Sequence, residues 1–255
     1  MTKAIFFDID GTLLSYKTHR LMPGTIEALT KLHKAGVLLF VASGRPMVLI
    51  PDMPIPFDGY ITVNGGYCIS GDEVLLRCPI AAEDTERWLD YVDAQHMSTM
   101  CFTAHDMYVN HITPEAEALR NQLDFTMPPL LPLKAMHGKE VYQFIALMPS
   151  EQDADVLSLL PNCRLPRWHA AFTDVIPANS SKAAGIECML NHFDLKPEET
   201  MAFGDGANDV EMLQYVGCGV AMGNASSEVK KQADFVTLTA DEEGILHALT
   251  QLHLI

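Results

Sequence analysis

The sequence predicts an α/β fold built on a parallel sheet, because buried strands alternate with helices near both ends of the chain. Residues 4–7 and 37–42 are continuous apolar runs, which are typical of parallel strands covered on both faces. Between them, apolar residues recur at helical spacing from Pro23, near a helix start, to Gly36 at a C-cap position. Together these segments predict a βαβ unit.

The rest of this sheet is expected from similar signals. A third strand at 60–63 is followed by a hairpin through residues 70–72. The last third repeats the alternation, with a helix at about 181–193, a strand at 200–203, a helix after Asn208 and a strand at 217–221.

The middle of the chain has a different pattern. We expect helices near 83–96, 114–125 and 151–160, and strands at 99–103, 108–111, 141–148 and 172–176. A self-contained α+β insert, entered near Pro79 and left near Pro177, fits this order better than one long sheet. We therefore expect a discontinuous core of residues 1–81 and 180–255 around an insert of residues 82–179.

Charge and composition exclude several classes of protein. The chain has 17 Lys and Arg against 33 Asp and Glu, a formal charge of −16, so we expect no nucleic-acid partner. The first apolar run reaches a carboxylate too early for a signal peptide, and no later run could span a bilayer. We expect a cytoplasmic protein without a membrane partner, whose scattered cysteines are reduced.

The segment Asp8-Ile9-Asp10-Gly11-Thr12 stands directly after the first strand. Ligands of open parallel sheets bind outside the carboxyl ends of the strands, which is where Asp8 would lie. Two carboxylates two residues apart, followed by a glycine that allows a sharp turn, suit a nucleophile beside an acid/base. A polar turn is the structural alternative, which the rarity of this five-residue pattern disfavours.

The segment Gly204-Asp205-Gly206-Ala207-Asn208-Asp209 also follows a strand. Because Asp205 and Asp209 are four residues apart, we expect the following helix to bring them onto one side near its N-terminus. Oxygen ligands without a nearby Cys or His indicate Mg²⁺ rather than zinc. Alone, the segment could equally be an N-cap with solvated carboxylates.

Two weaker signals concern phosphate binding. Ser43-Gly44-Arg45 ends the second strand and offers a hydroxyl and backbone N–H groups that a phosphate could approach, although Ser-Gly is also a common turn. Lys182 is expected in the first turn of a helix, where lysines are usually solvated. The positive end of the helix dipole disfavours it there unless an anion lies nearby.

In this order, the four segments resemble the motif set of the haloacid dehalogenase (HAD) phosphatases, which is D-x-D-G-T, a strand-end Ser or Thr, a later Lys, and G-D-x-x-N-D. The resemblance covers the entire chain. The insert between the second and third motifs is similar to the C2B cap of the Cof-type branch. Residues 219–225 and 233–237 resemble the C-terminal segments of the same branch. The chain departs from that branch at Lys182-Ala183, where Lys-Gly is usual. The resemblance implies a Rossmann-like core and a cap at 82–179 that supplies specificity.

The resemblance also implies a magnesium-dependent reaction. Asp8 would attack phosphorus and become an aspartyl-phosphate, while Asp10 protonates the leaving alcohol and later deprotonates water. Mg²⁺ would be held by Asp8, by the backbone carbonyl of Asp10 and by Asp205, with Asp209 completing the metal site. In formal charge, Mg²⁺ and Lys182 balance the three carboxylates, so a dianionic phosphate can enter despite the net charge.

Further residues would bind the substrate. Ser43, the Gly44 backbone and Asn208 would hold the non-transferred oxygens, with Arg45 adding positive charge. Candidates for contact with the hydroxyls of a sugar are Asn64 and Tyr67 beyond the third strand, and Arg167-Trp168-His169 in the insert, each of which could instead be a surface or packing residue.

The expected activity is hydrolysis of a small phosphate ester, with a hexose phosphate as the leading substrate. A phosphotransferase or mutase of the same superfamily is the nearest alternative. A sugar-phosphate-binding regulator is another, although binding alone needs no second carboxylate at Asp10. Response-regulator receiver domains also phosphorylate an aspartate, but they are shorter and have no D-x-D. Oligomeric state stays open.

Overall fold

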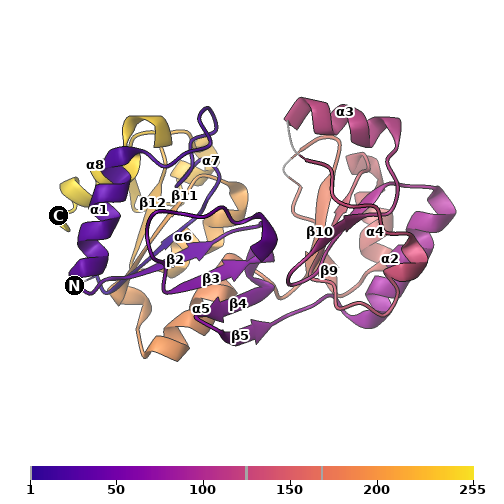
Figure 1. Ribbon diagram of the computed structural model, residues 1–255, viewed down its shortest axis with the longest axis horizontal. Helices are drawn as coiled ribbons and strands as arrows, with labels where there is room; N and C mark the ends of the chain where they lie inside the picture. The colour runs from indigo at the N-terminus through magenta and orange to yellow at the C-terminus, as the bar shows by residue number, and fades with distance from the viewer. Residues whose placement is uncertain (1, 124–125, 168) are drawn as a thin grey trace. The chain divides into compact units, whose positions relative to one another are not determined.

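The computed structural model describes residues 2–123, 126–167 and 169–255, which fold into two compact units (Figure 1). The core unit comprises the chain up to Gly44, Pro51–Arg77 and Ser181–Ile255. The insert unit comprises Cys78–Ser180 together with the short segment Arg45–Ile50. We expected Arg45–Ile50 to belong to the core, because its composition does not distinguish it from the strands on either side.

An eight-stranded sheet with the order β13-β12-β11-β1-β2-β3-β4-β5 forms the centre of the core unit. Its strands are β1 (Ala4–Phe7), β2 (Leu38–Ala42), β3 (Gly59–Thr62), β4 (Tyr67–Ser70), β5 (Glu73–Arg77), β11 (Thr200–Gly204), β12 (Cys218–Ala221) and β13 (Phe235–Val236). Pairing is parallel from β13 through β3, and β4 and β5 add an antiparallel hairpin. The predicted parallel α/β sheet is thus confirmed, with β1 between β11 and β2.

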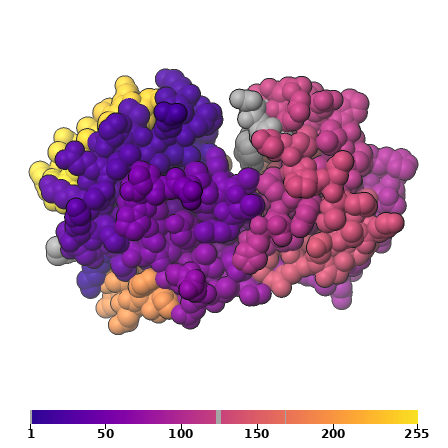
Figure 2. Space-filling view, viewed as in Figure 1, coloured from indigo at the N-terminus to yellow at the C-terminus, as the bar shows by residue number. Residues whose placement is uncertain are grey.

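The helices of this unit lie along the sheet. They are α1 (Pro23–Lys34), α5 (Lys182–Phe193), α6 (Val210–Tyr215), α7 (Ser227–Lys230) and α8 (Gly244–Gln251). Helix α5 packs on β2 to β5 and on α6. The C-terminal α8 packs against α1, and the yellow and indigo ends of the chain lie side by side (Figures 1 and 2). Within the described residues, no helix combines the length and apolar character that crossing a bilayer requires.

The central strands β1, β2 and β11 are buried on both faces, as the continuous apolar runs predicted. Phe6 stacks on Phe40 with ring centroids 4.8 Å apart, in a cluster that also holds residues of α5 and α6. Because successive strand residues alternate between faces, Phe7 lies on the other side, where it stacks on Phe203 at 5.2 Å. Asp8, the next residue, therefore follows a strand whose two faces are both packed.

The insert unit has an antiparallel five-stranded sheet with the order β7-β6-β8-β10-β9. Its strands are β6 (Thr99–Phe102), β7 (Met107–Val109), β8 (Gln143–Ala146), β9 (Cys163–Arg164) and β10 (Thr173–Pro177), and its helices are α2 (Ala82–Gln95), α3 (Pro114–Leu123) and α4 (Asp153–Leu159). The sequence pattern did not predict β9, which is too short for any periodicity. The last two residues of the helix expected to reach 125 lie outside the described part.

Candidate active site

Asp8 is the first residue beyond β1, in the middle of the sheet. Its backbone N–H donates to the carbonyl of Phe203 at 3.0 Å, which continues the pairing of β1 with β11. The following loop turns at Gly11, whose φ is +80°. A β-carbon there would lie 2.3 Å from Oδ2 of Asp205, so a glycine is required. The loop thereby holds the buried Asp8 carboxylate, 6% exposed, beside Asp205.

Lys182 links the first and last motifs. It is the first residue of α5, behind the N-cap Ser181, whose side chain accepts a hydrogen bond from the N–H of Ala184. The Lys182 Nζ donates to Oδ1 of Asp8 at 2.6 Å and to Oδ1 of Asp209 at 2.5 Å, and its side chain is fully buried. These two carboxylates are the nearby anions that a lysine at the positive end of a helix requires.

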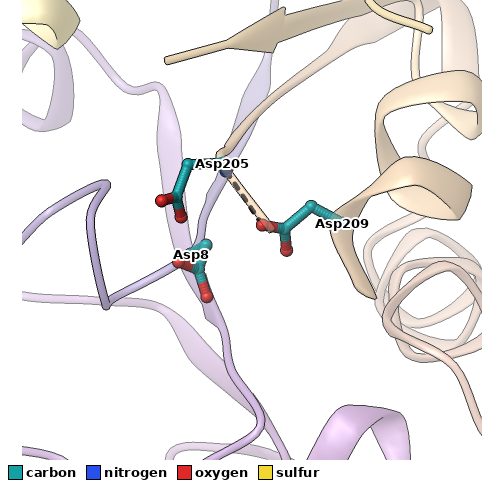
Figure 3. Close-up of side chains that lie close together, drawn as sticks. All are labelled: Asp8, Asp205 and Asp209. Atoms are coloured by element: carbon teal, nitrogen blue, oxygen red, sulfur yellow. Dashed lines mark hydrogen bonds between the residues drawn. The ribbon is translucent and has the colours of Figure 1, made fainter. Parts of the chain in front are cut away.

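Asp205 and Asp209 meet through a loop, and the prediction that one helix carries both is wrong. Asp205 follows β11 directly, the 3₁₀ turn Ala207–Asp209 comes next, and α6 begins only at Val210. The Asp209 carboxylate folds back, so that its Oδ2 accepts from the N–H of Asp205 at 2.9 Å and of Gly206 at 2.8 Å (Figure 3). Side-chain bonds to the loop backbone, rather than helical spacing, bring the two carboxylates together.

Burial and mutual repulsion shift the ionisation of this cluster. Burial raises the pKa of Asp8 well above its usual range; the Lys182 ammonium opposes this shift, whereas the charges of Asp209 and Asp205 add to it. Burial, and then the charge of Asp209, raise the pKa of Asp205 to about 6. Burial lowers the pKa of Lys182, but Asp209 and Asp8 outweigh it and the net shift is upward. One ammonium therefore faces three carboxylates, which leaves negative charge uncompensated.

Asp8, Asp205 and Asp209 could hold a metal ion. One carboxylate oxygen from each residue lies within 4.8 Å of the others (Figure 3). Mg²⁺ binds oxygen at about 2.0–2.1 Å, so ligands on opposite sides of the ion are about 4.1 Å apart. An all-oxygen set of this size fits Mg²⁺ with small adjustments. Both oxygens of Asp209 already accept hydrogen bonds, from Lys182 and from the backbone of Asp205. Asp209 is therefore suited to holding these neighbouring groups in place around the ion.

Four predicted phosphate or substrate contacts form one corner of the core unit. The carbonyl of Ser43, at the end of β2, accepts from the N–H of Asn64 at 3.0 Å. The Asn64 amide lies against Gly44, where a β-carbon would be 3.2 Å away, and its Oδ1 accepts from Nδ2 of Asn208 at 3.0 Å. Asn64 and the preceding Val63 both have positive φ, of 54° and 45°. That backbone is a genuine outlier for valine and marks a constrained turn.

The other substrate candidates have different surroundings. Arg45 and His169 belong to the insert unit, whereas the carboxylates belong to the core unit. Arg45 donates from Nη1 to the carbonyl of Leu49 at 2.8 Å. The His169 ring stacks on Phe172 at 4.9 Å. Tyr67 lies in β4 and is only 2% exposed, which makes it a core residue.

Arg167 is occupied by its own unit. Its Nε and Nη2 donate to the two carboxylate oxygens of Asp153, at 3.0 and 2.5 Å. Its Nη1 donates to the carbonyls of Met148, His169 and Ala170. The guanidinium thus holds the loop that carries His169, and Trp168 between them lies outside the described residues.

The motifs missed two residues that contact Asp205. The Tyr16 hydroxyl donates to the Asp205 carboxylate, and burial followed by the Asp205 charge raises the pKa of this phenol. Asn224 Nδ2 donates to Oδ2 of Asp205 at 2.8 Å. Asn224 stands shortly after an apolar strand, as Asp8 and Asp205 do, and this position in the sequence could have identified it as a site residue. No such feature of the sequence points to Tyr16.

Comparisons with known proteins agree with this geometry. A family model described as haloacid dehalogenase-like hydrolase matches residues 5–249. The protein YkrA of Bacillus subtilis (strain 168) is 33% identical over 258 residues, which cover 100% of this chain and 99% of that protein.

Solved structures give the same result. The HAD subclass IIB sugar phosphatase BT4131 is 37% identical, with a TM-score of 0.90 and full coverage of both chains. The HAD phosphatase BT1666 of Bacteroides thetaiotaomicron is 35% identical, with a TM-score of 0.93 and coverage of 100% of this chain and 96% of that one. The chain therefore belongs to the haloacid dehalogenase-like hydrolases and is a phosphatase of small phosphorylated substrates.

Proposed function

We propose that the protein is a Mg²⁺-dependent phosphomonoesterase that acts through an aspartyl-phosphate on Asp8, with a hexose phosphate as its substrate. The observation that carries this proposal is the buried carboxylate cluster at the end of β1, in which Lys182 joins Asp8 to Asp209 and Asp205 lies alongside. Nucleophile, cation and metal ligands thus come from three separate segments of the chain.

Asp8, Asp205 and the backbone carbonyl of Asp10 would hold Mg²⁺, with Asp209 supporting the site. Bound there, the ion would supply positive charge that keeps Asp8 ionised and neutralises the incoming phosphate. The need for it follows from the raised pKa values of Asp8 and Asp205, because a protonated Asp8 is not a nucleophile.

The first step forms a bond between an Asp8 carboxylate oxygen and phosphorus as the bond from phosphorus to the leaving oxygen breaks. The carboxyl group of Asp10 gives its proton to that oxygen. In the second step, the Asp10 carboxylate takes a proton from water while the water oxygen attacks phosphorus. The bond from phosphorus to Asp8 then breaks, which releases inorganic phosphate and regenerates both carboxyl groups.

Ser43, Gly44 and Asn208 would bind the phosphate oxygens that stay on phosphorus. Their support comes from Asn64, which contacts all three of these residues. Asn208 is exposed and Asn64 is buried, so the buried amide of Asn64 holds the exposed amide of Asn208 in position. Arg45 and His169 are proposed as substrate contacts from outside the core unit.

Substitution of the two motif aspartates tests the mechanism. Nitrophenolate is a good leaving group that needs little protonation, so Asp10→Asn should release about one equivalent of nitrophenol and then stall with phosphate on Asp8. Asp8→Asn should give no burst, because the nucleophile is absent. Steady turnover by Asp8→Asn, with no phosphoprotein by mass spectrometry in either variant, contradicts the proposal.

The substrate is proposed from the likeness to the sugar phosphatase BT4131 and from the polar candidates above. A panel of phosphomonoesters, assayed for phosphate release with Mg²⁺ and with EDTA, tests both the substrate and the metal. Full activity after chelation and dialysis contradicts the metal site. Transfer of the phosphoryl group to a second sugar, without free phosphate, would identify a mutase instead.

Residues 82–179 are proposed to act as a cap that selects the leaving group. This range holds no residue of the four motifs, so replacing it with the corresponding segment of BT1666 should change the ranking of substrates and leave metal dependence intact. An unchanged ranking counts against the cap role. A cytoplasmic location stays a prediction.

A further inference from the structure

Asn224 connects the loop after β1 with the loop after β11. It stands three residues beyond β12, and its Nδ2 donates both to the carbonyl of Gly11, at 2.9 Å, and to Oδ2 of Asp205, at 2.8 Å. One amide group thus joins the turn that follows the nucleophile to a proposed metal ligand.

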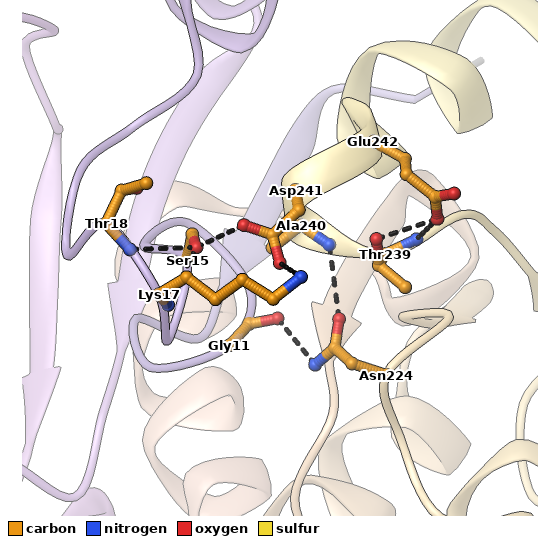
Figure 4. Close-up of polar contacts among 9 residues, drawn as sticks. All are labelled: Gly11, Ser15, Lys17, Thr18, Asn224, Thr239, Ala240, Asp241 and Glu242. Carbon is orange, nitrogen blue, oxygen red and sulfur yellow. Dashed lines mark hydrogen bonds and ion pairs between the residues drawn. The ribbon is translucent and has the colours of Figure 1, made fainter.

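Backbone groups fix which way this amide faces. The Asn224 Oδ1 accepts from the N–H of Ala240 at 3.2 Å, on the other side of the amide from the Nδ2 bond to Gly11 (Figure 4). The Ala240 N–H can only donate, and the Gly11 carbonyl can only accept. A flipped amide would set donor against donor and acceptor against acceptor. Asn224 must therefore always present a donor to Asp205.

The segment that supplies the N–H of Ala240 is itself anchored to the loop after β1. We call residues 239–242 the C-terminal bracket. Its Asp241 accepts a hydrogen bond from the Ser15 hydroxyl and pairs with the Lys17 ammonium at 3.2 Å (Figure 4). Thr239 and Glu242 close a capping box that shapes the turn. The bracket is thus connected to the loop at two points, at Gly11 through Asn224 and at Ser15 through Asp241.

We propose that Asn224 is a positioning residue for the metal site, and that the C-terminal bracket sets its orientation. By donating from Nδ2 to Oδ2 of Asp205 while also bound to the Gly11 carbonyl, Asn224 keeps the Asp205 carboxylate turned toward Asp8. This inference rests on the proposed Mg²⁺ site. Residues that orient metal ligands typically change metal affinity by about 10- to 100-fold when they are replaced.

Two variants remove the contact from opposite ends. Asn224→Ala deletes the amide, and because Asn224 is exposed, the core stays packed. Ala240→Pro deletes the N–H that orients it and leaves the Asn224 side chain intact. The backbone accepts this proline, since Ala240 is the first residue of a 3₁₀ turn and Thr239 has φ −68° and ψ 163°, as a residue before proline prefers.

A matched control is Glu243→Ala, which borders the bracket without touching Asn224. The Glu243 carboxylate accepts from the N–H groups of Gly24 and Thr25, both at 2.8 Å, and so ties the same segment to α1. Its loss should cost stability but leave Asp205 in place. Comparison of the three variants separates a general loosening of the C-terminal segment from loss of the Asn224 contact.

The experiment measures metal binding directly, by calorimetry with Mg²⁺ and by the EPR signal of free Mn²⁺. We expect Asn224→Ala and Ala240→Pro to raise Kd by about 10- to 100-fold, with kcat at saturating Mg²⁺ within a few-fold of wild type, and Glu243→Ala to bind normally. Unchanged Kd in Asn224→Ala, or an equal rise in Glu243→Ala, overturns the inference. Failure of the wild-type protein to bind either ion would instead overturn the proposed metal site.

Discussion

Gly65 faces the carbonyl oxygen of Ser181 so closely that a β-carbon at Gly65 would lie 1.9 Å from that oxygen. Ser181 is the N-cap of α5, the helix that begins with Lys182. The constrained turn after β3, which carries Asn64, is therefore packed directly against the helix end that delivers the lysine to Asp8. Two parts of the site that are far apart in sequence share this one backbone contact.

Gly65→Ala should reduce both stability and activity. Gly65 has a φ of +87°, so alanine there costs about 1–2 kcal/mol from backbone strain and a further 1–3 kcal/mol from the clash with Ser181. Gly36 is the matched control, because it has the same φ of +87° but nothing within 4 Å of its β-carbon position. Thermal unfolding and phosphatase assays of both variants check this, and equal losses in the two would contradict the role of the contact.

Lys182→Met should destabilise the metal-free protein. Removing the ammonium leaves Asp8 and Asp209 buried without their cation, and breaking a buried pair in this way costs about 3–5 kcal/mol. Added Mg²⁺ should recover part of this stability, since it restores positive charge, while activity stays low. Thermal melts with and without Mg²⁺ measure the difference. A melting temperature equal to wild type without metal would show that the pair contributes nothing.

Mg²⁺ binding should weaken as the pH falls through about 6. The pKa of Asp205 is raised to about 6 in the metal-free protein, so below that pH Mg²⁺ must displace a proton, and the apparent affinity drops by up to about tenfold per pH unit. Because the folded pKa lies above the unfolded value of 3.8, protonation of Asp205 also favours the metal-free fold at low pH, and this contribution disappears as the pH rises through 6. Titration calorimetry with Mg²⁺ from pH 5 to 8 tests the change in affinity, and scanning calorimetry of the metal-free protein over the same range tests the change in stability. We expect Asp205→Asn to flatten both pH profiles.

Arg167→Lys should lower the stability of the insert unit. A lysine cannot bridge both oxygens of Asp153 and reach three carbonyls at once, so we expect a loss of about 1–3 kcal/mol. The control is Arg120→Lys in the same unit, where the exposed arginine pairs with Glu117 at 3.8 Å and the change should stay within about 0.5 kcal/mol. An altered KM with unchanged unfolding would show that Arg167 binds substrate instead.

The sequence by itself determined the elements that carry the site. Continuous apolar runs revealed β1 and β11, so Asp8 and Asp205 could be placed at the carboxyl edge of a parallel sheet. Helical spacing placed Lys182 at the start of α5. These inferences succeeded because strand and helix periodicity is local and is visible in a few consecutive residues.

The relations between those elements were decided only by the tertiary structure. The bond from Lys182 to Asp8 spans 174 positions, and the contact of Asn224 with Gly11 spans 213. The fold of the Asp209 carboxylate onto the loop backbone, which overturned the expected helix face, depends on hydrogen-bond geometry that spacing does not encode. The occupation of Arg167 by Asp153 is another such case. Local patterns report which segments reach the sheet edge, whereas the partner of each polar side chain follows from packing between segments that the chain brings together only on folding.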